Sequence, residues 1–244
     1  MTSTSRSRSA SASASSDEGD WRACVEYETK RVAVGGLEVQ VFQMEELPVA
    51  ASLFMLAEMD ANAAEISGTR LWTGSHFLSR VRSIVASKLG ATRCLATDGD
   101  AEVVELLAKN VEVNGAVDVV TARSLFWGDE ASTETLLTEI PDAFAATDVV
   151  LAGDVLYKRE LLPLLFATVT RVLTSPDSNR AFVLCHVPRA DVTHDVVQKQ
   201  IEASGLQFEE VTLPAEDVAD ATAELEECPM EDVGRAKLYY ITKR

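Results

Sequence analysis

Residues 148–157 read DVVLAGDVLY, and this stretch indicates the class of fold. Asp148 to Ala152 is a short apolar run, of the kind found in a strand that is buried on both faces of a parallel sheet. The segment from Arg159 to Leu173 that follows is predicted to be a helix. Strands that alternate with helices of this length build a parallel α/β sheet with covered faces.

The same alternation continues on both sides of this stretch. Three of the predicted helices end at a glycine or at an Asn-Gly pair, which are common helix stop signals: Gly90, Asn114-Gly115 and Gly205. The last two strands have no helix between them, so we expect an antiparallel hairpin at the C-terminal edge of the sheet. The other predicted strands are 93–97, 117–121, 181–186, 207–213 and 237–242, and the other predicted helices are 75–89, 101–114 and 192–204.

The N-terminal part of the chain has a different character. Residues 1–20 form a Ser/Arg-rich tail that is predicted to be disordered. Residues 21–67 are predicted to form a β-hairpin, which turns at Gly35-Gly36, and a helical extension. Residues 68–244 are then the α/β domain. The composition of the tail weakly resembles a mitochondrial transit peptide, but it lacks an apolar helical face, so a solvated tail is the preferred interpretation.

Composition limits the classes of function. The chain has 244 residues, 47% of them hydrophobic, and 22 Lys and Arg against 39 Asp and Glu give a net charge of −17. Such a charge repels phosphate backbones, so nucleic acid is not expected as a partner, whereas a basic partner is. The sequence has no apolar run of roughly 18–20 residues that would span a membrane. The four cysteines are scattered, which predicts a reduced intracellular chain and no metal site.

Residues that follow the predicted strands are the candidates for chemistry, because ligands of open α/β sheets bind outside the carboxyl ends of the strands. Asp98 and Asp100 follow the strand 93–97. A carboxylate there can hold both hydroxyls of an adenosine ribose, or it can cap the helix that begins at Ala101. Trp127 follows the strand 117–121 and is either a core anchor or one wall of a purine slot. Both pairs of interpretations stay open.

Two further segments carry candidate residues. Asp154 and Tyr157 follow the strand 148–152 and could orient an amine or hydroxyl nucleophile, although Asp154 could also cap the next segment. Trp72 stands in the glycine-flanked stretch 68–75, either as the wall of a lid or as a residue that packs the hairpin onto the domain. We assign no role to the three histidines.

These segments, in this order, resemble the seven-strand (class I) S-adenosylmethionine-dependent methyltransferases, and within them the protein-lysine methyltransferases of family 16. The resemblance runs from the hairpin near Val25 to the end of the chain. It rests on four motifs together: the stretch 68–75, Thr97-Asp98 with Asn110 and Asn114 on the next helix, Phe126-Trp127-Gly128-Asp129, and Asp154-Val155-Leu156-Tyr157.

The resemblance implies a Rossmann-like sheet and S-adenosyl-L-methionine as the cofactor. By analogy, Trp72 and Gly74 line the cofactor cleft, Asp98 holds the ribose hydroxyls, and Trp127 with Gly128 lies beside the adenine. Asp154 and Tyr157 receive the substrate lysine. No metal is implied. The substrate implied is a protein, and the acidic charge favours a basic segment of it.

One departure from the family is large. Between the helix that starts at Ser75 and the helix end at Gly90, the family has its first strand and a Gly-rich loop. Here there is no glycine between Gly74 and Gly90, and we estimate that about twenty residues are missing. Because the family's strand order is 3-2-1-4-5-7-6, the absent first strand is the central one.

Two functions are the main expectations, and methylation of a small molecule stays open beside them. The first is methyl transfer to a protein lysine, with the activity of this form in question. The alternative is a non-catalytic, methyltransferase-like isoform that binds a partner. A nicotinamide oxidoreductase would need a Gly-x-Gly-x-x-Gly string, which the sequence lacks. We expect a cytoplasmic location, with the nucleus as an alternative and the mitochondrion as a lesser one.

Overall fold

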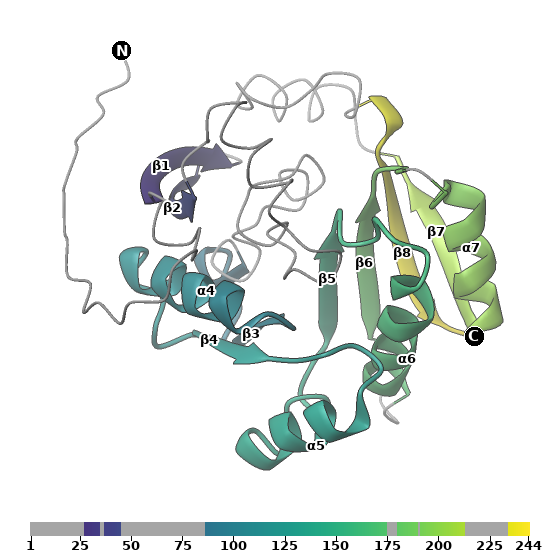
Figure 1. Ribbon diagram of the computed structural model, residues 1–244, viewed down its shortest axis with the longest axis horizontal. Helices are drawn as coiled ribbons and strands as arrows, with labels where there is room; N and C mark the ends of the chain where they lie inside the picture. The colour runs from purple at the N-terminus through teal and green to yellow at the C-terminus, as the bar shows by residue number, and fades with distance from the viewer. Residues whose placement is uncertain (1–26, 35–36, 45–85, 175–179, 190, 213–233) are drawn as a thin grey trace, which may run out of the picture.

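The computed structural model describes residues 27–34, 37–44, 86–174, 180–189, 191–212 and 234–244 (Figure 1). These residues form a mixed α/β fold. The strands are β1 (Tyr27–Val34), β2 (Leu37–Met44), β3 (Cys94–Asp98), β4 (Val120–Ser124), β5 (Val149–Gly153), β6 (Ala181–His186), β7 (Leu206–Val211) and β8 (Lys237–Lys243). The helices are α4 (Ala101–Val113), α5 (Glu130–Glu139), α6 (Leu161–Leu173) and α7 (His194–Ala203). Within these ranges no helix is long and apolar enough to cross a membrane.

The strands form three separate sheets. β1 and β2 make the expected antiparallel hairpin, and β3 pairs with β4 in parallel. The third sheet has the order β5-β6-β8-β7, in which β5 and β6 are parallel and β8 runs antiparallel to both of its neighbours. The antiparallel C-terminal pair is thus confirmed, with β8 inside the sheet and β7 at its edge.

Most predicted elements form within one to three residues of their predicted ends, and two differ for clear local reasons. The strand predicted at 117–121 lies at Val120–Ser124, because the chain keeps turning after α4: the Val120 amide donates to the Ala116 carbonyl at 2.8 Å. Helix α5 was not predicted. It buries only Thr133 and Leu136, so it has little apolar periodicity, and it is fixed by an N-cap in which Asp129 accepts from the Ser132 amide at 2.6 Å.

The main core lies between the four-stranded sheet and two helices. α6 and α7 pack beside each other on the sheet (Figure 1). The core is made by fully buried side chains from both layers, including Phe166 on α6, Phe182 on β6, Ile201 on α7, and Tyr239 and Ile241 on β8. This packing fixes the position of the β5 and β6 ends, where the candidate residues lie.

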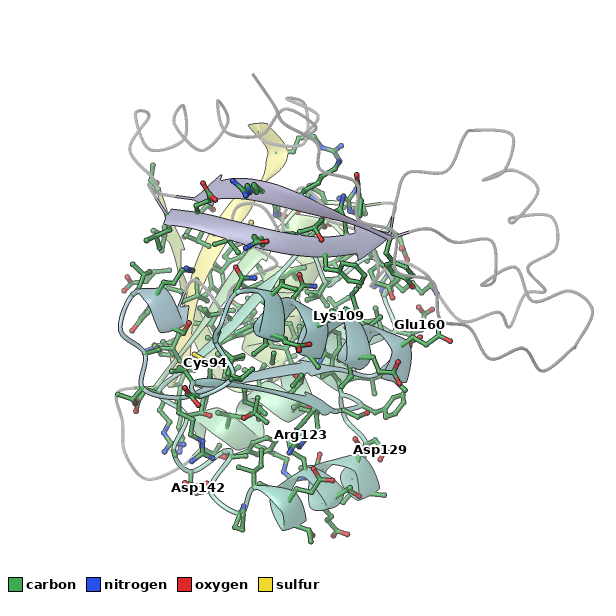
Figure 2. All side chains as sticks on the ribbon, turned by 90° about the vertical axis from the view of Figure 1, so that its left-hand side faces the viewer. Cys94, Lys109, Arg123, Asp129, Asp142 and Glu160 are labelled. Carbon is green, nitrogen blue, oxygen red and sulfur yellow. The ribbon has the colours of Figure 1, made fainter. Side chains whose placement is uncertain are left out.

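The hairpin is attached to the rest of the fold by α4. Figure 2 shows the hairpin, α4 and the β3–β4 pair stacked as layers, with Lys109 on α4. Two asparagines one helical turn apart bind the edge of β2. Asn110 accepts from the Phe42 amide at 2.6 Å and donates to the Phe42 carbonyl at 2.9 Å. Asn114 bonds to Gln40 in the same way, at 2.9 and 2.6 Å.

Among the described strands, none joins β3 to β5. The single continuous sheet implied by the resemblance is therefore not formed by the described residues, which divide into a β3–β4 pair and the sheet that starts at β5. Both strands line the same cavity.

Candidate active site

A cavity of about 1330 Å³ extends along β3 and β5 and reaches the carboxyl ends of both strands. The carboxyl ends of the strands are where open α/β sheets bind ligands. The candidate side chains at this end come from the end of β3 and from the loops after β4, β5 and β6. They are Asp98, Phe126, Trp127, Asp154, Tyr157 and Arg189. Sequence reasoning named four of these six.

The structure assigns the capping role to Asp100, one of the two carboxylates at the end of β3. Asp100 is the N-cap of α4, since its Oδ1 accepts from the Glu102 amide at 2.8 Å. Asp98 is not the cap. Its Oδ1 accepts from the Asp100 amide at 2.9 Å, which fixes the carboxylate at the end of β3. The Leu125 amide donates to the Asp98 carbonyl at 2.8 Å, so the loops after β3 and β4 are joined.

The loop after β4 presents two aromatic rings. Phe126 is 56% exposed and lines the cavity. Trp127 is half-buried. It lines the cavity and also packs against the main core, so being a core anchor does not exclude it from being one wall of a purine slot. Phe126 was not predicted as a site residue. Its place beside Trp127, directly after a strand, was the available signal.

Gly128 shapes this loop without lining the cavity. Its φ of +71° lies in the left-handed region, and a Cβ there would stand 2.9 Å from Leu164 Cδ2. The Gly128 amide donates to Thr168 Oγ1 on α6 at 2.8 Å. The close approach to α6 therefore requires glycine, and it sets the position of Trp127.

Asp154 is the most constrained residue of the site. It has a φ of +54°, which side-chain-bearing residues rarely adopt, and its side chain is 1% exposed. Its Oδ1 accepts from Arg189 Nε at 3.0 Å, and its Oδ2 accepts from a second guanidinium nitrogen. Asp154 does not cap the next helix, because α6 begins at Leu161 with Glu160 as the preceding residue.

Tyr157 and Arg189 complete this end of the cavity. Tyr157 is half-buried, and Lys158 Nζ lies 5.6 Å from the centre of its ring. Arg189 comes from the loop after β6 and was missed by sequence reasoning. An arginine shortly after a predicted strand is too common to have been distinguished there.

A pair of histidines lies close to the site. His186, at the end of β6, is fully buried, and its Nδ1 stands 3.0 Å from Nδ1 of His194. Burial, together with the nearby His194, lowers the pKa of His186 to about 4, although Asp154 acts in the opposite direction. His186 is therefore neutral at physiological pH. In the described part of the chain, no group of three or more His, Cys, Asp or Glu side chains could hold a metal ion.

Several predictions lie outside the described residues. These include the tail, the helical extension, Trp72 and Gly74, and most of the predicted helix 75–89. Residues 86–88 of that helix are described and are helical, and Gly90 follows with a φ of +98°, as expected for a helix stop. The domain boundaries and the cytoplasmic location stay predictions.

Comparisons with known proteins find similarity to methyltransferases. A family model described as lysine methyltransferase matches residues 81–203. Protein-lysine N-methyltransferase EFM3 from Chaetomium thermophilum is 35% identical over 106 residues, which cover 42% of this chain and 30% of that protein. The match thus spans less than a third of the length of this relative.

Solved structures of methyltransferases are similar at lower identity. SMU.776, a candidate methyltransferase complexed with SAH, is 13% identical with a TM-score of 0.45, covering 87% of this chain and 55% of that one. Precorrin-6y C5,15-methyltransferase from Geobacter metallireducens is 16% identical with a TM-score of 0.37, covering 62% and 67%.

Proposed function

The chain belongs to the lysine methyltransferase family, and on that premise we propose that it binds S-adenosylmethionine and methylates a lysine side chain of a protein substrate. The observation that carries this proposal is that Asp98, Trp127, Asp154 and Tyr157 line one cavity, although they come from the ends of three different strands and the loops that follow them. The relative that is a protein-lysine N-methyltransferase supports lysine as the acceptor.

The cofactor end of the site would be the loops after β3 and β4. Asp98 offers a carboxylate at a strand end, which suits the two hydroxyls of a ribose. Phe126 and Trp127 offer aromatic surface within the same cavity, which suits a purine. The residues present thus fit an adenosine group. When bound, the cofactor supplies an electrophilic methyl group.

The acceptor end would be Asp154 and Tyr157. A carboxylate and a phenol that line the cavity can accept hydrogen bonds from an amine and direct its lone pair. The amine must be neutral, because an ammonium has no lone pair. Burial of Asp154 keeps water away from one side of the amine. The net charge of −17 suits a basic segment as the substrate.

We also propose that this form lacks the family's central first strand and its Gly-rich loop. Support comes from the separation of the described strands into two sheets between β3 and β5, and from the absence of glycine between Gly74 and Gly90. Such a loop would offer helix N-terminal amides to the carboxylate of the cofactor. Without it the cofactor binds more weakly. This favours the second candidate function, a partner-binding protein without turnover.

Methyl transfer from radiolabelled S-adenosylmethionine to a lysine-peptide array tests the proposal. Asp154→Asn is expected to lower the rate by about 100-fold, since the amine loses its orienting carboxylate, while cofactor binding is kept. The matched control is Asp142→Asn, which removes an exposed carboxylate that pairs with Arg93 at 2.7 Å and does not line the cavity. Equal rates for wild type and Asp154→Asn would contradict the proposed role.

A further inference from the structure

The ion pair between Asp154 and Arg189 has no role in the function proposed so far. Asp154 is buried, and the guanidinium of Arg189 binds both of its carboxylate oxygens. Arg189 lines the same cavity, with its side chain 25% exposed. The carboxylate that faces the acceptor amine in the proposed function is therefore already joined to a cation.

The loop after β6 is built to present this arginine. Arg189 and Val192 exchange backbone hydrogen bonds, at 3.3 and 2.8 Å, which close a tight turn. Val192 is fully buried and anchors the turn in the main core. The guanidinium of Arg235 donates to the Pro188 carbonyl at 2.8 Å and holds the residue before Arg189. The backbone thus fixes where the Arg189 side chain starts.

The charge of this pair decides which form of an amine the site favours. A buried carboxylate alone stabilises an ammonium beside it, because opposite charges attract strongly at low dielectric. The amine would then be held in the form that cannot react. A carboxylate paired with a guanidinium has no net charge, so it no longer favours the ammonium over the neutral amine.

On the basis of the proposed function, we infer that Arg189 is a positioning residue that holds the Asp154 carboxylate and cancels its charge, so that the site takes the substrate lysine as a neutral amine. The ammonium proton leaves to water before transfer. The amine lone pair then forms the N–C bond while the S–C bond breaks and its electron pair stays on sulfur, and the methylated ammonium loses a proton to water on release.

Other charged or titratable groups line the same cavity or lie next to residues that line it. Asp98 stands at the end of β3, and Tyr157 and Lys158 follow β5. His186, on β6, is neutral above its low pKa of about 4. Arg189 is the group that binds the Asp154 carboxylate at hydrogen-bond distance on both oxygens, so its removal changes the charge next to the amine most directly.

The pH dependence of kcat tests the inference in the full 244-residue chain, with a peptide that wild type methylates in the lysine-peptide array. In Arg189→Gln, Asp154 becomes a net negative charge, so the acid limb of the profile moves to higher pH by about one unit or more. Arg189→Lys keeps the positive charge but loses the bidentate hydrogen bonding to Asp154. Its acid limb therefore stays near that of wild type while kcat falls. The control Arg235→Gln disturbs the same loop and leaves the limb unchanged.

A double variant separates charge from structure. Asp154→Asn with Arg189→Gln removes both charges, so the acid limb returns to the wild-type position even though kcat is low. Circular dichroism checks that each variant is folded. If Arg189→Gln is not folded, the double variant is used in its place. An acid limb that stays in place in folded Arg189→Gln, or that does not return in the double variant, overturns the inference while the proposed function stands. If wild type methylates no peptide, the proposed function fails and the inference with it.

Discussion

Truncation of the asparagines on α4 should release the hairpin from the domain. In the structure, Asn110 makes two hydrogen bonds to the backbone of Phe42, and Asn114 makes two to that of Gln40. A net value of about 0.5–1.5 kcal/mol per bond gives a loss of about 1–3 kcal/mol for Asn110→Ala or Asn114→Ala. Because both side chains bind the same edge of β2, the loss of stability in a double variant should differ from the sum of the two single losses.

Amide hydrogen exchange is the most specific assay for this prediction. The Phe42 amide donates to Asn110 at 2.6 Å, so Asn110→Ala should speed its exchange by about 5- to 150-fold, the equivalent of 1–3 kcal/mol. Asn110→Asp keeps the acceptor for this amide and loses the donor to the Phe42 carbonyl, so it should have a smaller effect. Core amides of β6 should exchange as in wild type. Unchanged exchange at Phe42 in the Asn110→Ala variant would refute the account of how the hairpin is held.

Two further predictions concern stability. Burial lowers the pKa of His186 from an unfolded value near 6.5 to about 4, so the unfolded state binds a proton more readily than the folded state does. The free energy of unfolding therefore falls as the pH falls from 6.5 towards 4, by an amount on the order of 2 kcal/mol at pH 5. Urea unfolding at pH 7 and pH 5 measures this loss. His186→Gln should reduce the difference in the free energy of unfolding between the two pH values, whereas an unchanged difference would count against the burial argument. Gly128→Ala should cost about 2–4 kcal/mol, from its left-handed φ and its contact with Leu164. Gly205→Ala has a similar φ of +75° but open space around its Cβ, so it should cost only about 1–2 kcal/mol; equal losses for the two would show that the contact with Leu164 is unimportant.

The sequence was most informative where local signals and apolar periodicity agreed. The β6 strand was predicted at its observed limits, and α4 began at the predicted residue because Asp100 is an effective N-cap. Helix α5 was missed because its face towards the core is narrow. The order of the strands came from the resemblance and not from periodicity, since the pattern of one strand does not say which neighbour it pairs with.

The site was predictable to the extent that it follows strand ends. Asp98, Trp127, Asp154 and Tyr157 all line the cavity, and each lies at the end of a strand or within four residues of one. Arg189 could not be found in this way. Its proposed role depends on a contact with Asp154, which lies 35 positions earlier in the chain and has a positive φ. Neither property is visible in the sequence.

Thermal unfolding of the 244-residue chain with and without S-adenosylhomocysteine tests the central claim most directly. A ligand at 100 times its dissociation constant adds about 2.7 kcal/mol, which for a chain of this size raises Tm by roughly 5–10 °C. The proposed function predicts a cooperative transition whose Tm rises with the concentration of S-adenosylhomocysteine. Methionine, which lacks the adenosine group, should not raise it. A cooperative transition that stays fixed at millimolar ligand would contradict cofactor binding and leave the partner-binding function in its place.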